Sequence, residues 1–155
     1  MKYSRLTKEQ FEELHKEFIN FLATQSITAD EWATMKAKKP VLAEQELDVF
    51  SDLIWEGVLS NARYFENISE QQMNLFYAKE SSMSLLVVKI LKNNINIMTV
   101  EGFTWLKQNL TSNYVEIFTA SKDYLNEPNS DKFKLIKEGA YISDGDLFRA
   151  VKSIV

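Results

Sequence analysis

The first sixty residues carry apolar side chains at the spacing of a helix. The positions that recur at intervals of three and four are Phe11, Leu14, Phe18, Phe21 and Leu22. Before them, Thr7 and Gln10 have the types and spacing of a capping box, in which each side chain binds the other residue's backbone N–H. We therefore predict a first helix over residues 8–24.

Two further helices are predicted in this part of the chain. Thr28 and Glu31 repeat the capping signature and begin a second helix, which Pro40 ends. The third helix spans residues 41–59 and is apolar on more than one side. This pattern is typical of a helix that is central in the fold or partly covered by a partner.

Beyond residue 61 the apolar pattern changes to short extended runs, with a helical turn expected at 69–72. Strands are predicted over 63–66, 74–78, 83–91, 95–100 and 114–119. The run 83–91 is apolar on both faces except at Lys89, so we expect it inside the sheet. Asn93 and Asn94 favour a tight hairpin turn into the strand over 95–100.

Three more helices are expected in this second part. One spans residues 99–110, although Gly102 in its first turn weakens it. A short helix is capped by Ser130 and ended by Gly139 in the left-handed conformation. The sequence from Ser143 to Asp146 opens a helix at the C-terminus.

The predicted fold class is α+β. An N-terminal group of three helices packs on a mainly antiparallel sheet of about four or five strands, with C-terminal helices closing an edge or face. We expect one domain over residues 1–155, with a helical part at 1–60 and a mixed strand and helix part at 61–155. The change of period marks a boundary between layers.

The composition removes the commonest routes to catalysis. The chain has no Cys, a single His and four scattered Gly, so it lacks thiolate metal sites and phosphate-binding loops. His15 borders the apolar face of the first helix, where it is a surface residue or, with Glu12, a general base. We therefore expect a non-enzymatic interaction or adaptor protein without a cofactor.

Charge is unevenly distributed along the chain. The net charge is −4, with 7 basic and 11 acidic residues in 1–60 and 11 of each in 61–155. An acidic protein repels phosphate backbones, so nucleic-acid binding is disfavoured. Nucleic-acid binding stays a weaker alternative through a compact basic group of Lys132, Lys134 and Lys137, and Lys36, Lys38 and Lys39 form a second such group. No apolar run has the length of a leader or a membrane span, and we expect a cytoplasmic protein without membrane contact.

An acidic stripe is the candidate partner-binding surface. Asp48, Asp52 and Glu56 follow each other at intervals of four, so they share one face of the third helix. Such a face meets solvent, cations or a basic partner, and the neighbouring Trp55 would supply an apolar anchor. With Trp32, these residues predict a surface for a protein partner or for a homo-oligomer.

Two other groups carry alternative chemistry. Asp144 and Asp146 flank Gly145 and could hold a divalent metal for a carboxylate-based hydrolase, although a helix cap uses the same residues. A stacking platform is the second, with core packing as its alternative. Its candidate aromatics are Trp32, Trp55, Trp105, Tyr64, Phe76, Tyr77, Tyr114 and Tyr124.

Two stretches of the chain resemble a known family. The first is Lys2-Tyr3-x-Arg5-Leu6-Thr7 with the later Phe18-Ile19-x-Phe21-Leu22-Ala23 and Ile27-Thr28-Ala29-Asp30-x-Trp32. The second is Glu138-Gly139-Ala140-Tyr141-Ile142-Ser143-x-Gly145-x-Leu147-Phe148. Together they are similar to a family of small bacterial proteins of unknown function. The resemblance covers the whole chain and implies a free-standing domain without assigning an activity.

Overall fold

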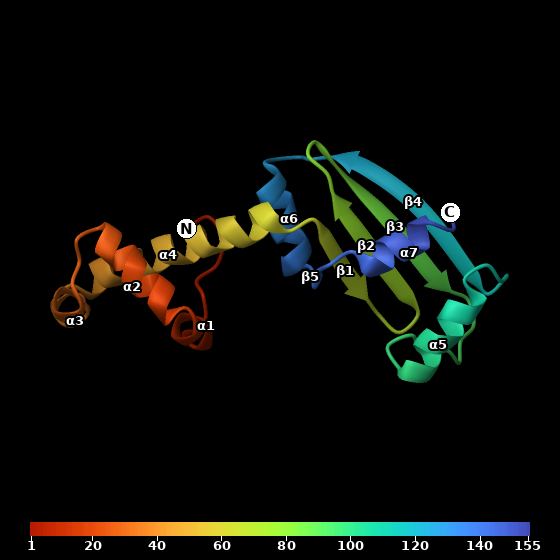
Figure 1. The fold of residues 1–155 in the computed structure, drawn as a ribbon, viewed down its shortest axis with the longest axis horizontal. Helices are drawn as coiled ribbons and strands as arrows, with labels where there is room; N and C mark the ends of the chain where they lie inside the picture. Colours follow the sequence, from red (N-terminus) through yellow and green to blue (C-terminus); the bar gives the residue numbers. More distant parts are fainter. The chain divides into compact units, whose positions relative to one another are not determined.

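The change from helical to extended periodicity near residue 61 coincides with a division of the structure. The computed structural model describes residues 1–155, which form two units, Met1–Ser60 and Asn61–Val155. Figure 1 shows helices in the first unit and a sheet with helices in the second. None of the helices combines the length and the apolar character that crossing a membrane requires.

The first unit contains four helices. They are α1 (Lys8–Glu13), α2 (His15–Thr24), α3 (Ala29–Lys38) and α4 (Pro40–Asn61). The single helix predicted over 8–24 is divided at Leu14, whose φ of −99° and ψ of 22° leave the helical region. The capping box of Thr7 and Gln10 is confirmed, and the Thr28 side chain accepts the Glu31 N–H.

Aromatic rings hold these four helices together. Phe18 of α2 lies at the centre, with its ring 5.0 Å from that of Phe50 in α4 and 5.2 Å from that of Trp32 in α3, both in edge-to-face geometry. Phe11 stacks on Phe50 at 5.9 Å. Aromatic pairs of this kind add about 0.5–1.5 kcal/mol each beyond the burial of their area. The apolar face predicted from the sequence therefore forms the core of the unit.

The second unit is built on a five-stranded antiparallel sheet in the order β4-β3-β2-β1-β5. Its strands are β1 (Tyr64–Ile68), β2 (Gln72–Ala78), β3 (Ser82–Ile90), β4 (Val115–Asp123) and β5 (Tyr141–Ser143). The α+β class is confirmed. The apolar run predicted over 83–91 corresponds to β3, which is paired on both sides.

Helices cover both faces of the sheet. They are α5 (Val100–Asn109), α6 (Pro128–Lys137) and α7 (Asp146–Lys152). Leu106 of α5 and Phe148 of α7 share one hydrophobic cluster with Leu75, whereas Leu135 of α6 shares another with Ala78. Because successive strand residues alternate between faces, α5 and α7 lie on one face and α6 lies on the other.

Two predicted elements are wrong. The helical turn expected at 69–72 is the hairpin between β1 and β2, closed by the Ser69 N–H donating to the Gln72 carbonyl at 2.8 Å. Residues 95–100 form no strand, because the buried Ile97 donates its N–H to the Glu70 carbonyl and fills the core as part of a loop. The strand that pairs with β3 on that side is β4, reached through α5.

The beginning of α6 also differs from the prediction. Ser130 does not cap this helix, because the helix already begins at Pro128 and Glu127 is its N-cap residue. Proline is favoured in the first turn, where its missing N–H costs no hydrogen bond. The left-handed conformation predicted for Gly139 is confirmed, with φ of 105°.

Candidate functional site

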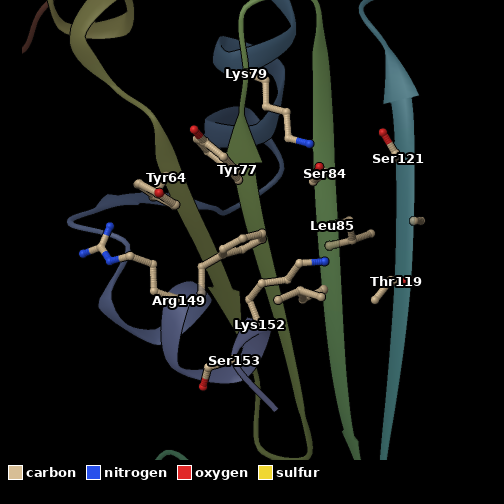
Figure 2. A pocket seen from close by; sticks show the side chains of 13 residues that line it. Tyr64, Tyr77, Lys79, Ser84, Leu85, Thr119, Ser121, Arg149, Lys152 and Ser153 are labelled. Carbon is tan, nitrogen blue, oxygen red and sulfur yellow. The ribbon is translucent and has the colours of Figure 1, made fainter. Parts of the chain in front are cut away.

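A groove of about 670 Å³ lies on the sheet face that carries α7. Strands β1 to β4 supply its floor and α7 supplies one wall (Figure 2). Ligand sites of proteins commonly have volumes of about 300–1,000 Å³. The groove is therefore large enough to hold a small molecule or several residues of a bound segment.

Three aromatic rings form the side of the groove near α7. Tyr64 and Tyr77 are direct cross-strand partners on β1 and β2, and their rings stack at 4.7 Å with an interplanar angle of 11°. Phe148 of α7 contacts both rings, at centroid distances of 5.7 and 5.6 Å. Gly145 starts this helix with φ of 88°, and a Cβ there would lie 2.5 Å from the Tyr64 ring. Because the Gly145 backbone lies so close to the Tyr64 ring, the ring cannot move toward α7, and the position of the aromatic wall is fixed.

Three hydroxyl side chains lie on the opposite side of the floor, among Leu85, Leu86 and Ala120. Ser84 of β3 is opposite Ser121 of β4, and Leu86 is opposite Thr119. The β4 residues from Phe118 to Asp123 are exposed. Hydroxyl groups on an open strand face can donate to or accept from a ligand, which suits recognition of polar groups next to the aromatic wall.

Three cationic side chains and no carboxylate line the groove. Lys79 follows β2 and its ammonium lies 6.0 Å from the Tyr77 ring centre, whereas Lys152 reaches over the floor from α7 (Figure 2). Arg149 lies 5.1 Å from the Tyr64 ring and pairs with Asp146 at 2.8 Å. Hydrogen bonding to Tyr64 and Asp146 raises the pKa of the Arg149 guanidinium. The groove therefore combines positive charge with an aromatic surface.

The acidic stripe predicted on the third helix contacts the chain's own N-terminal segment. We call residues 2–6 the N-terminal strap. Asp52 of α4 accepts the backbone N–H groups of Lys2 and Tyr3 at 2.6 and 2.8 Å. Glu56 accepts the Tyr3 hydroxyl at 2.6 Å. The stripe thus binds an extended segment along one side of α4.

The basic residue of this contact is Arg5. Its guanidinium forms ion pairs with Glu44 and Asp48 of α4. Trp55 donates its indole N–H to the Ser4 carbonyl at 3.1 Å. A partner predicted for Asp48, Asp52, Glu56 and Trp55 would therefore have to displace the strap. That surface stays a prediction.

Trp32, the fifth residue predicted for partner binding, lies inside the first unit. Its exposed fraction is 9%, its ring packs on Phe18, and the Lys36 ammonium lies 5.9 Å from the ring centre. His15 and Glu12 line a hollow of the same unit, and Trp32 and Lys36 line it as well. The structure therefore does not bring Trp32 onto the surface of the acidic stripe.

Asp144 and Asp146, the predicted ligands of a divalent metal, lie at the start of α7. Asp144 accepts the Asp146 N–H at 3.0 Å, and Asp146 pairs with Arg149. No group of three or more metal-ligating side chains occurs in the structure. The metal alternative stays a prediction, which calorimetric titration with Mg²⁺, Mn²⁺ and Ca²⁺ would test.

The basic group predicted on α6 does not form one solvent-facing patch. Lys132 is buried, and its burial lowers the pKa of its ammonium. Lys134 and Lys137 are exposed. The nucleic-acid alternative therefore has two exposed lysines on this helix instead of three.

The groove could not be predicted from the sequence. Tyr64 and Tyr77 were among the candidates for a stacking platform, but their pairing depends on the register of β1 and β2. Arg149 and Lys152 are separated by a single helical turn, and Lys79 lies far from both in the sequence. The available signal was the i, i+3 spacing on the C-terminal helix, which indicates one shared face.

The fold and the groove define an α+β protein in which an antiparallel sheet presents a cationic, aromatic-walled face beside a terminal helix. The chain belongs to DUF6495, a family of unknown function that matches residues 1–155. This match confirms the predicted membership of a family of unknown function. No curated protein and no solved structure matches the chain significantly.

Proposed function

We propose that this protein is a non-enzymatic interaction protein whose groove binds an acidic segment of a partner protein. The observation that carries the proposal is the lining of the groove by Lys79, Arg149 and Lys152 without a carboxylate. In residues 61–155 as a whole, acidic and basic residues are equal in number. The excess of positive charge is therefore confined to the groove and is not a property of residues 61–155 as a whole.

The aromatic wall supports a protein segment as the ligand. Tyr64, Tyr77 and Phe148 offer a surface for an apolar side chain, while Lys152 and Arg149 meet neighbouring carboxylates. An ion pair between exposed side chains contributes about 0.2–1 kcal/mol, so charge alone would give weak binding and the aromatic contact has to add to it. A segment that alternates acidic and apolar residues would use both features at once.

Charge favours a short acidic segment over a nucleic acid. The protein has a net charge of −4, which repels a long phosphate backbone. Arg149 is already paired with Asp146, so the groove offers a small excess of positive charge. Such an excess suits a few carboxylates better than a continuous series of phosphates.

Fluorescence anisotropy of the full chain tests this proposal. The probe is a fluorescein-labelled synthetic peptide of alternating glutamate and phenylalanine, and a peptide with lysine in place of glutamate is its negative control. We expect the acidic peptide to bind and the basic peptide not to bind. Affinity should fall as salt is raised, because exposed charges are screened over about 10 Å at 0.1 M ionic strength.

A pair of charge reversals locates the binding. Lys152→Glu in the groove should weaken binding about tenfold or more, because it places a carboxylate against the carboxylates of the peptide. Lys134→Glu on α6 changes the net charge equally but lies outside the groove, so it should leave the affinity unchanged. Equal losses in both variants, or no binding of the acidic peptide, would contradict the proposal. Tighter binding of oligo-deoxythymidine would assign the groove to nucleic acid instead.

A further inference from the structure

Strand β4 is a long, uninterrupted edge of the sheet. It has nine residues and pairs with β3 without interruption from Val115 to Asp123. It contains no Pro and no bulge, and its residues from Phe118 onward are exposed. The opposite edge of the sheet, β5, has only three residues. Open edges of this length are usually shortened, bulged or covered, because they pair readily with another strand.

The hydrogen-bonding direction along β4 follows from its pairing with β3. Leu91 donates its N–H to the Tyr114 carbonyl at 2.8 Å, in register with the ladder that pairs Ile90 with Val115. Backbone groups of an antiparallel strand alternate in direction, residue by residue. The even-numbered residues of β4 therefore bond to β3, and the odd-numbered residues from 115 to 123 direct N–H and C=O toward the open edge.

We propose that this edge pairs with β4 of a second copy of the chain, antiparallel, about a two-fold axis at Thr119. Thr119 of each copy then forms a hydrogen-bonded pair with its counterpart. Ile117 pairs in the same way with Ser121 of the second copy. All these residues are odd-numbered, so their backbone groups already face the open edge. The result is a continuous sheet of two copies.

Charge complementarity favours a second copy of the chain as the pairing strand, and it favours this register. With the axis at Thr119, Glu116 lies opposite Lys122 of the second copy, and symmetry repeats the pair. These are non-hydrogen-bonded pairs, in which opposite Cα atoms approach to about 4.5 Å and side chains are closest. Moving the axis by one residue would place Glu116 opposite Ala120 or Tyr124 instead. The strand is therefore complementary to itself in one register.

An exposed aromatic ring lies between the two charge pairs. Phe118 is 51% exposed, although Phe is among the residue types that are most often buried. In the proposed register it lies opposite Ala120 of the second copy and diagonal to the second Phe118. Diagonal neighbours across antiparallel strands are within reach of aromatic side chains. Pairing would bring the two rings within contact distance of each other next to the axis.

Pairing at this edge would also extend one side of the groove. Thr119 and Ser121 line it from β4, so the strand of the second copy would border each groove along this side. The two grooves would then open on the same face of the continuous sheet. The inference itself rests on the edge strand and is independent of the acidic ligand.

Sedimentation of the full chain over a wide range of concentrations tests the inference. We expect a monomer–dimer equilibrium in the wild type. Lys122→Glu should weaken dimerisation roughly 10- to 30-fold, because it creates two like-charge pairs where opposite charges had faced each other. Glu116→Lys should weaken it as well, but it also places a Lys opposite Lys89 of β3 in its own sheet, so Lys122→Glu is the decisive single variant. The double variant Glu116→Lys with Lys122→Glu restores both pairs and should dimerise like the wild type. A monomer at all concentrations, or single variants that dimerise normally, would overturn the proposal.

Oxidative cross-linking gives an independent measurement, because the chain contains no Cys. Thr119→Cys should form a disulfide between copies readily, since a hydrogen-bonded pair has Cα atoms about 5.5 Å apart, within disulfide range. Ser121→Cys is the matched control on the same face of the same strand. In the proposed register its counterpart lies about 13 Å away, so it should cross-link slowly. Equal rates for the two variants would overturn the register.

Discussion

The phenolic hydroxyl of Tyr3 donates a 2.6 Å hydrogen bond to a carboxylate oxygen of Glu56. It fixes the N-terminal strap to α4, beside the two backbone N–H groups that Asp52 accepts. Burial, together with the hydrogen bond to Glu56, raises the pKa of Tyr3 to about 12. The protonated phenol is thus the form that the folded first unit stabilises.

This relationship predicts a loss of stability at high pH. The folded pKa of Tyr3 lies above its ordinary value of 10.0, so its contribution is complete below that pH and is lost as the pH rises toward about 12. Tyr3→Phe should lower the free energy of unfolding by about 1–3 kcal/mol at neutral pH. It should also flatten the dependence on pH between 10 and 12. Urea unfolding followed by tryptophan fluorescence measures both effects.

The control for this measurement is Tyr114→Phe. Tyr114 is 53% exposed, so removing its hydroxyl should change neither the stability at neutral pH nor its fall above pH 10. If Tyr3→Phe and the wild type lost stability in parallel between pH 10 and 12, the hydrogen bond to Glu56 would not be the cause.

Removing the acceptor of the strap should release it from α4. Asp52→Ala deletes both oxygens that accept the Lys2 and Tyr3 N–H groups. We expect trypsin to cleave after Arg5 faster than in the wild type, because cleavage requires the segment to leave the helix. Glu9→Ala, on the exposed side of α1, is the control. Mass spectrometry of the first cleavage products would show the difference, and equal rates in both variants would contradict the prediction.

Local sequence signals predicted the elements that local physics determines. The capping box at Thr7 and the N-cap at Thr28 are satisfied by residues three positions away. The apolar run over 83–91 forms β3 because both of its faces are covered or partly covered. In these cases the information lies within a few residues of the element, and one sequence is sufficient.

Features that depend on contacts between residues distant in the sequence could not be predicted. Residues 95–100 have the composition of a strand, but the edge of β3 is taken by β4, and Ile97 packs as a loop residue instead. The groove depends on the register that places Tyr64 against Tyr77 and on α7 beside them. The acidic stripe of α4 was recognised, whereas its contact with residues 2–6 depends on a chain reversal that periodicity does not report.

Glycine has a low helix propensity, but the space at residue 102 in the first turn of α5 admits no side chain. A Cβ at this residue would lie 1.7 Å from the carbonyl oxygen of Asn96, which is backbone and cannot rotate away. Gly102→Ala should therefore destabilise the second unit by at least about 2 kcal/mol, despite the better helix propensity of Ala. Thermal unfolding followed by circular dichroism measures the change.

Gly57 in α4 provides the opposite case. A Cβ there would have no heavy atom within 4 Å apart from its chain neighbours and its own helix backbone, and the Gly57 backbone is helical. Gly57→Ala should therefore stabilise the protein by about 0.5–1 kcal/mol through helix propensity. If both alanine variants shifted stability in the same direction, the Asn96 contact would not explain the difference.

Gly145 connects the start of α7 to the wall of the groove. Its φ of 88° is unfavourable for other residues, and a Cβ would lie 2.5 Å from the Tyr64 ring. Gly145→Ala should cost more than the roughly 1–2 kcal/mol of left-handed backbone strain, because the ring must also move. Gly139→Ala is the matched control, since its φ is 105° but its nearest neighbour to a Cβ is 3.8 Å away.

The two glycine variants should differ in binding as well as in stability. Displacing Tyr64 disrupts its stack with Tyr77 and its contact with Arg149, so Gly145→Ala should weaken binding of the acidic peptide at concentrations where it remains folded. Gly139→Ala leaves these rings in place and should bind as the wild type does. Anisotropy titrations beside circular dichroism separate the two effects. Normal peptide affinity in a folded Gly145→Ala variant would show that the Tyr64 wall is not part of the binding surface.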